Sequence, residues 1–195
     1  MLVIHCDLKP ENILIKSYSR CEVKVIDFGS SCFTTDHLSS YVQSRSYRAP
    51  EVMIGLPYDC KVDIWSLGCI VAELFMGNVL FLNDSIPTLL GRINAIVGPF
   101  PESMRSRARY YRRYYTEDNV LFELRPEGTA VYIHPKRTSL RKRIKCSHKP
   151  FLDFLEQLLQ IDPSKRYVLS MCDPTCNVSA NGPVLRLPDQ LRHKR

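Results

Sequence analysis

The segment from Lys61 to Gly77 places the strongest constraint on how this 195-residue chain can fold. Its sequence, KVDIWSLGCIVAELFMG, is apolar on nearly every side of a helical wheel and stops at a glycine, as many helices do. Because such a helix has to be enclosed by other elements, the segment predicts a buried helix. Asp63, near its start, would be a buried carboxylate, which is tolerated only where specific groups donate hydrogen bonds to it.

A polar octet near the start of the chain, between apolar runs at 2–4 and 13–15, is the first candidate for chemistry. Its sequence is His5-Cys6-Asp7-Leu8-Lys9-Pro10-Glu11-Asn12. A hairpin is predicted next, because residues 13–16 and 22–26 alternate in strand fashion around a polar turn at 17–20. The triplet Asp27-Phe28-Gly29 follows this hairpin, and Ala49-Pro50-Glu51 follows a loop rich in Ser, Thr and Tyr. Asp7 and Asp27 are therefore both predicted at the ends of strands.

In this order, the three motifs resemble the catalytic loop, the metal-binding triplet and the end of the activation segment of eukaryotic protein kinases. The stretches HCDLKPENIL, SRSYRAPEV and IGLPYD are similar to the dual-specificity tyrosine-regulated kinases of the CMGC group, and Cys6 stands where most kinases have arginine. The resemblance implies a mainly α fold, a kinase-like C-terminal lobe with a small β-hairpin at the catalytic cleft. This lobe would span residues 1–166 with an insertion at about 99–149, and 167–195 would be a divergent, flexible tail.

The resemblance also implies roles for four residues in phosphoryl transfer. Asp7 matches the catalytic aspartate that orients the acceptor hydroxyl and takes its proton, and Lys9 matches the lysine that neutralises charge on the transferred phosphate of ATP. Asn12 and Asp27 match the residues that hold Mg²⁺ against the ATP phosphates, and hard cations of this kind prefer oxygen ligands.

Supporting contacts are implied in the same way. Phe28 would pack beneath His5, Asp63 would hold the backbone of the catalytic loop, and Arg166 would pair with Glu51.

Tyr41 is a candidate phosphorylation site in the loop between the second and third motifs. In the resembling family a tyrosine of the activation segment is phosphorylated by the kinase itself, and Tyr41 matches the second tyrosine of that pattern, while Ser39 replaces the first. Arg45 and Arg48 are the predicted charge partners of a phosphate on Tyr41. Without these neighbours, Tyr41 would be interpreted as an ordinary surface tyrosine.

The N-terminal lobe of a kinase is predicted to be absent from these residues, because no G-x-G-x-x-G motif occurs among them. The 195 residues alone are therefore expected to have negligible kinase activity and weak nucleotide binding. An alternative is a non-catalytic substrate-docking or dominant-negative module. The expected partners are protein substrates, together with a missing N-terminal lobe or a full-length kinase.

Composition bears on location and on a third function class. The eight cysteines form no CxxC pair or zinc-like spacing, and no secretory leader is visible, which favours reduced thiols in the cytoplasm or nucleus. No apolar run suits a membrane span. The net charge of +7 is concentrated at 105–113 and 136–145, as in a nucleic-acid binder, but these clusters lie in the insertion without a nucleic-acid-binding motif, which disfavours that reading.

Overall fold

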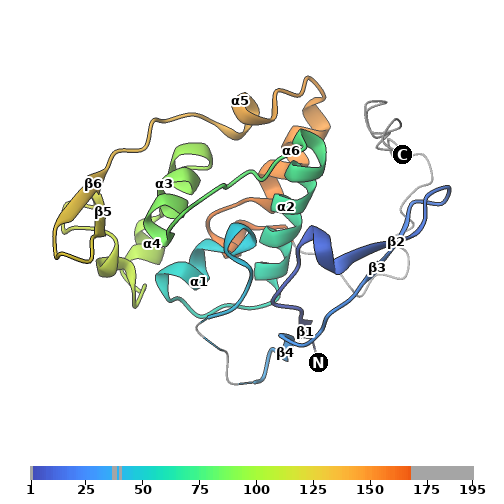
Figure 1. Cartoon of the computed structure of the whole chain (residues 1–195), viewed down its shortest axis with the longest axis horizontal. Coiled ribbons are helices and arrows are strands. Elements are labelled where there is room, and N and C mark those ends of the chain that lie inside the picture. Colours follow the sequence, from blue (N-terminus) through green and yellow to red (C-terminus); the bar gives the residue numbers. More distant parts are fainter. Residues whose placement is uncertain (1, 37–38, 40, 168–195) are drawn as a thin grey trace.

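Helices dominate the computed structural model, which describes residues 2–36, 39 and 41–167 (Figure 1). Six α-helices lie in this part of the chain, in agreement with the mainly α prediction. They are α1 (Pro50–Ile54), α2 (Lys61–Met76), α3 (Ile86–Ile96), α4 (Glu102–Arg105), α5 (Leu140–Ile144) and α6 (Lys149–Leu158). Short 3₁₀ turns occur at Pro10–Asn12, Arg45–Tyr47, Tyr111–Arg113 and Pro163–Lys165.

The described residues contain three separate two-stranded antiparallel sheets. The predicted hairpin is present as β2 (Ile13–Ser17) and β3 (Glu22–Val25), with Ile13 opposite Val25. Two further pairs were not predicted: β1 (Val3–Ile4) with β4 (Cys32–Phe33), and β5 (Leu121–Leu124) with β6 (Ala130–Ile133). Strands of two to four residues are too short to show a period of two clearly.

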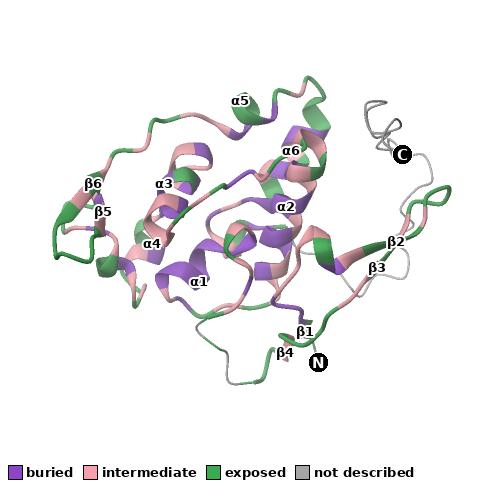
Figure 2. Ribbon diagram, in the orientation of Figure 1, coloured by how far each residue is buried: buried purple, intermediate pink, exposed green. Residues whose placement is uncertain are grey.

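Helix α2 lies in the middle of the helical body, with α6 packed against it (Figures 1 and 2). Trp65 is fully buried and stacks on Phe81 with ring centroids 5.6 Å apart. The prediction of an enclosed helix holds for Trp65 and Ile70, but Val71 is half-buried and Leu74 in the last turn is 55% exposed. Gly77 then ends the helix in the left-handed conformation at φ 76°.

Gly68 allows α2 to approach the segment at the end of α6 closely. A Cβ atom at this position would lie 2.8 Å from Cδ2 of Leu159, which is closer than real Cβ contacts. The small residue is therefore required by packing, although glycine within a helix costs about 1 kcal/mol relative to alanine.

We expect Gly68→Ala to lower the free energy of unfolding by about 1–3 kcal/mol, because the added methyl overpacks the contact with Leu159. Urea unfolding followed by circular dichroism measures this loss. Leu74→Ala, on the exposed side of the same helix, is the control and should change stability by no more than about 0.5 kcal/mol. A Gly68→Ala variant as stable as the parent chain would show that the contact is loose.

The predicted insertion at 99–149 contains regular structure of its own. Helix α4 ends at Arg105, the hairpin β5–β6 follows, and α5 precedes α6. An aromatic cluster supports the start of this insertion: the rings of Tyr111 and Tyr115 stack at 4.3 Å, and Phe100 meets both edge-on. Among the described residues, no helix has the length and apolar character needed to cross a bilayer. The predicted tail at 167–195 lies outside the described residues except for Tyr167.

Candidate active site

The backbone of the polar octet is held by a carboxylate from the central helix. The backbone N–H of His5 donates to Asp63 Oδ2 at 2.7 Å, and that of Cys6 donates to Oδ1 at 3.1 Å. Cys6 adopts φ 63°, a left-handed conformation that costs a non-glycine residue about 1–3 kcal/mol unless its surroundings enforce it. The two hydrogen bonds to Asp63 hold Cys6 in this conformation. Asp63 itself is half-buried, whereas the sequence predicted a buried carboxylate. Burial raises the pKa of Asp63, and the two N–H donors oppose this increase.

His5 links the octet to the Asp27-Phe28-Gly29 triplet. Its Nε2 lies 3.1 Å from the carbonyl oxygen of Ile26, which only accepts, so Nε2 carries the hydrogen. Its Nδ1 accepts from the backbone N–H of Asp7 at 3.2 Å. The ring of Phe28 meets the His5 ring edge-on, with centroids 4.9 Å apart. The two motifs are thus joined through one imidazole.

Asp7 sits at the centre of a charged and polar cluster. Its Oδ2 pairs with Lys9 Nζ at 2.7 Å, and its Oδ1 accepts from the backbone N–H of Ser44 at 3.0 Å and from Ser44 Oγ at 2.7 Å. Partial burial by itself would raise the pKa of Asp7, but the hydrogen bonds from Lys9 and Ser44 outweigh it and hold the pKa below its ordinary value. The carboxylate is therefore ionised and oriented at neutral pH.

An NMR titration of the Asp7 carboxyl carbon should give a midpoint below 3.8, the ordinary value for aspartate, and Lys9→Met should raise that midpoint. The folded-state pKa lies below the unfolded one, so the interaction stabilises the fold above about pH 4. This contribution is lost as the pH falls through the folded-state pKa. Lys16→Met, which removes an exposed pair with Glu22, is the matched control and should leave the Asp7 midpoint unchanged. A midpoint at or above 3.8 in the parent chain would contradict the geometry.

Asn12 and Asp27 supply oxygen atoms at the same end of the hairpin. Asn12 Nδ2 donates to the carbonyl oxygen of Asp7 at 2.9 Å, which leaves Oδ1 as its ligand atom. The backbone N–H of Ile26 donates to the Asn12 carbonyl at 2.9 Å, and Asp27 follows at once, exposed and in the left-handed conformation at φ 62°. Asp27 Oδ1 accepts from the backbone N–H of Gly29 at 3.3 Å.

This donor set fits Mg²⁺ that is shared with a phosphate ligand. Magnesium is usually held in proteins by one or two side-chain oxygens together with substrate phosphates. Within residues 2–36, 39 and 41–167, no group of three or more His, Cys, Asp or Glu residues gathers to hold a metal by itself. Asn12 and Asp27 therefore suit a cation that arrives with its phosphates.

A sequence comparison decides the family. The family model for the protein kinase domain matches residues 1–174 of this chain. The chain belongs to the protein kinase family. Its relatives include dual specificity tyrosine-phosphorylation-regulated kinase 2 of Drosophila melanogaster, with 41% identity over 84% of this chain and 23% of the relative. The DYRK-family kinase pom1 of Schizosaccharomyces pombe is 40% identical over 84% of this chain and 15% of its own length.

Other relatives are named serine/threonine kinases. The kinase ppk15 of Schizosaccharomyces pombe is 38% identical over 85% of this chain and 36% of the relative. The match to this chain covers between 15% and 36% of the length of these three curated relatives. The predicted resemblance to the dual-specificity tyrosine-regulated kinases is confirmed.

The loop before α1 carries Tyr41, the predicted phosphorylation site, together with the two arginines predicted to pair with its phosphate. Tyr41 is 76% exposed, and the guanidinium carbon of Arg48 lies 4.4 Å from its ring centroid. Arg48 also donates to the carbonyls of Val42 and Gln43, each at 2.8 Å, while Arg45 donates to the carbonyl of Asp84 at 3.0 Å. Hydrogen bonding to Arg48 and the charges of Arg48 and Arg45 lower the pKa of Tyr41.

Glu51 and Arg166 form a buried bidentate ion pair away from the catalytic loop. The two nitrogen–oxygen distances are 2.7 and 3.0 Å, and the residues are 1% and 2% exposed. Arg166 also donates to the carbonyls of Lys61 at 2.7 Å and Gln160 at 3.0 Å. The pair therefore joins the start of α1 to α2 and to the segment after α6.

Two residues that complete this site, Ser44 and Gln43, were not predicted from the sequence. Ser44 bonds both Asp7 and Lys9, the latter at 3.2 Å. Gln43 is buried at φ 69° and its side chain bonds Ser66 Oγ at 2.8 Å, the Val62 carbonyl at 3.0 Å and the backbone N–H of Ala49 at 2.8 Å. Their only signal was their place between Tyr41 and Arg45 in a stretch that resembles kinases.

Proposed function

We propose that this chain carries the catalytic loop of a protein kinase that transfers the γ-phosphate of ATP to serine or threonine hydroxyls of protein substrates. The observation that supports this most is the Asp7 carboxylate, held between Lys9 and Ser44 beside the oxygen ligands Asn12 and Asp27. Phosphoryl transfer depends mainly on positioning and charge stabilisation, and this cluster supplies both.

In this proposal the Asp7 carboxylate orients the acceptor hydroxyl and takes its proton as the hydroxyl oxygen bonds to the γ-phosphorus of ATP. The bond from that phosphorus to the β–γ bridging oxygen breaks, and ADP leaves. Lys9, which pairs with Asp7 at 2.7 Å, offers its ammonium to the negative charge of the transferred group. Asn12 and Asp27 would hold Mg²⁺, which when bound neutralises charge on the phosphates. Ser44 keeps the Asp7 carboxylate in one orientation through its backbone N–H and its hydroxyl.

Tyr41 is proposed as the site of tyrosine autophosphorylation. Its exposure makes the hydroxyl accessible, and Arg48 stands over the ring. A phosphate there would bring two negative charges close to Arg45 and Arg48, and charge-assisted hydrogen bonds of this kind order a loop.

We also propose that residues 1–166 act as the C-terminal lobe and need a second lobe to cover the cleft. The strands beside the site present apolar side chains to solvent, and Leu14, Ile15 and Val23 are each about half exposed. An apolar surface of this kind is typical of a site that another protein segment or a ligand covers. By themselves, the 195 residues are expected to bind nucleotide weakly and to turn over negligibly.

The test joins the N-terminal lobe of the Drosophila relative ahead of Leu2 and measures phosphate transfer from Mg-ATP to a basic protein substrate. We expect the joined protein to be active and the 195 residues alone to be inactive. Activity of the 195 residues alone, abolished by Asp7→Asn, would contradict the need for a second lobe. A joined protein that folds and binds ATP but transfers no phosphate would contradict the kinase function.

A further inference from the structure

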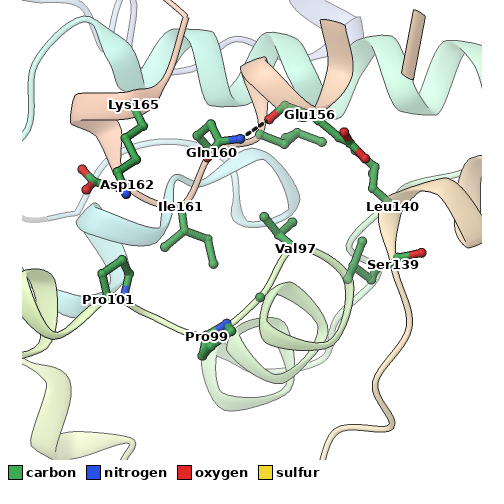
Figure 3. A pocket seen from close by; sticks show the side chains of 13 residues that line it. Val97, Pro99, Pro101, Ser139, Leu140, Glu156, Gln160, Ile161, Asp162 and Lys165 are labelled. Atoms are coloured by element: carbon green, nitrogen blue, oxygen red, sulfur yellow. Dashed lines mark hydrogen bonds between the residues drawn. The ribbon is translucent and has the colours of Figure 1, made fainter. Parts of the chain in front are cut away.

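Two hollows lie on either side of the segment that follows α3, far from the catalytic loop. One, of about 380 Å³, lies between this segment and the end of α6, and Figure 3 shows Val97, Pro99 and Ile161 at its apolar side. Its lining carries the carboxylates of Glu156 and Asp162 together with the ammonium of Lys165, so charges of both signs border it. The other hollow, of about 320 Å³, lies between α3 and the β5–β6 hairpin and has a different character.

The second hollow, called the hairpin hollow below, has apolar walls. They are formed by Pro99, Tyr115, Val120, Leu121, Ile133 and Pro135. A volume of about 320 Å³ is at the small end of protein ligand sites, which suits one or two side chains better than a large cofactor.

The walls of the hairpin hollow are fixed by close packing against α3. A Cβ atom added at Gly91 would lie 3.2 Å from Leu121 Cδ2, 3.4 Å from Ile133 Cγ2 and 3.5 Å from Pro135 Cγ. The backbone N–H of Thr138 also donates to the Ala95 carbonyl at 2.9 Å, which ties the chain after β6 to the same helix. The hollow is therefore preformed, and a ligand would not have to order it first.

The rim of the hairpin hollow is basic. His134 and Arg137 line it, both are exposed, and no carboxylate is among the lining residues. Glu117 and Asp118 precede the lining residue Asn119, but in the described part of the chain no ion pair joins either of them to Arg137. Arg137 is therefore available to an external anion.

We propose that the hairpin hollow is a docking site for an acidic peptide segment of a partner protein. A bulky aliphatic side chain of the peptide fills the apolar hollow, and an adjacent Asp or Glu pairs with Arg137 at the rim. In Figure 1 the β5–β6 hairpin lies at the opposite end of the structure from the β2–β3 hairpin, which directly follows the polar octet, so docking leaves the octet free. The proposal does not depend on kinase activity, because it requires only the insertion and α3.

The test measures the fluorescence anisotropy of labelled octapeptides with the full chain. One peptide has a central Leu flanked by Asp and Glu, a second has Ala in place of Leu, and a third has Leu flanked by Lys. We expect saturable binding of the first peptide only, weakening as salt rises. Arg137→Glu should weaken this binding by at least about tenfold, and Ala95→Trp, which places a bulky side chain at the wall, should weaken it to a similar degree.

Arg125→Glu is the matched control, because Arg125 is exposed in the turn between β5 and β6 and does not line the hairpin hollow. Arg125→Glu should leave the peptide affinity unchanged. Arg137→Glu alters an exposed side chain, so this variant is expected to fold normally. The proposal is overturned if the Leu and Ala acidic peptides bind equally, if the basic peptide binds better, or if Arg137→Glu has no effect. Self-association of the chain that Arg137→Glu abolishes, without peptide binding, would assign the surface to a second copy and also overturn it.

Discussion

Replacing Arg166 by methionine should lower the free energy of unfolding by about 3–5 kcal/mol, because the change leaves a buried carboxylate without its partner. Glu51 is 1% exposed and receives two hydrogen bonds from Arg166. The substitution also leaves the carbonyl oxygens of Lys61 and Gln160 without the hydrogen bonds that Arg166 donates to them. Since domains of this size are stable by only about 5–15 kcal/mol, a loss of this order removes a large part of the total.

Urea unfolding followed by far-UV circular dichroism is the suitable measurement. The guanidinium carbon of Arg166 lies 5.3 Å from the ring of Trp65, so tryptophan emission would change with the substitution itself. Arg141→Met is the matched control: it removes ion pairs with Asp153 at 2.6 Å and Glu156 at 2.8 Å, but these side chains are exposed, so the pairs should contribute little to stability. The interpretation fails if Arg166→Met costs no more than Arg141→Met.

A second variant separates the buried charge from the lost packing. Adding Glu51→Gln to Arg166→Met removes the uncompensated charge, so the double variant should recover part of the lost stability. Full recovery is not expected, because the carbonyls of Lys61 and Gln160 remain without their donor.

The long helices could be predicted from the sequence because each carries a sustained apolar pattern. Helix α2, predicted from 61 to 77, spans Lys61–Met76 and is capped by Gly77. The hairpin β5–β6 was missed, since its strands have four residues each and lie mostly at the surface. Its position is set by contact with α3 around Gly91, which is information about tertiary packing that no local pattern holds.

The candidate site also contains residues that could be predicted from the sequence and residues that could not. Asp7, Lys9 and Asn12 lie within one short motif, so their proximity follows from the sequence. Ser44 reaches Asp7 from 37 residues away, and that contact depends on how the activation segment folds back over the catalytic loop. Gln43 is also hard to predict, because a left-handed glutamine has no propensity signal and is held by its bonds to Ser66 and Ala49.

In the protein joined to an N-terminal lobe, Asp7→Asn should reduce kcat by about 10²–10⁴-fold, the range for loss of a positioned general base. The amide is nearly isosteric and keeps an oxygen for Ser44, so the loss reflects the missing negative charge and proton acceptor rather than a collapsed loop. A cooperative thermal transition of the Asp7→Asn protein, only slightly lower than that of the parent protein by circular dichroism, would support that reading, because the variant loses only the ion pair with Lys9. An Asp7→Asn protein with full activity would remove Asp7 from the chemistry.

Ser44→Ala should cost less, about tenfold in kcat, because the hydroxyl bond to Asp7 is lost but the backbone N–H bond at 3.0 Å remains. The acid side of the pH–rate profile provides an independent check. The pKa of Asp7 is held below its ordinary value of 3.8, so protonation of Asp7 should not limit activity while the pH stays above about 4. Removing the Ser44 hydroxyl weakens one of the bonds that lower this pKa, and the acid limb should then begin at higher pH. A purely structural role for Ser44 would reduce activity without moving the acid limb.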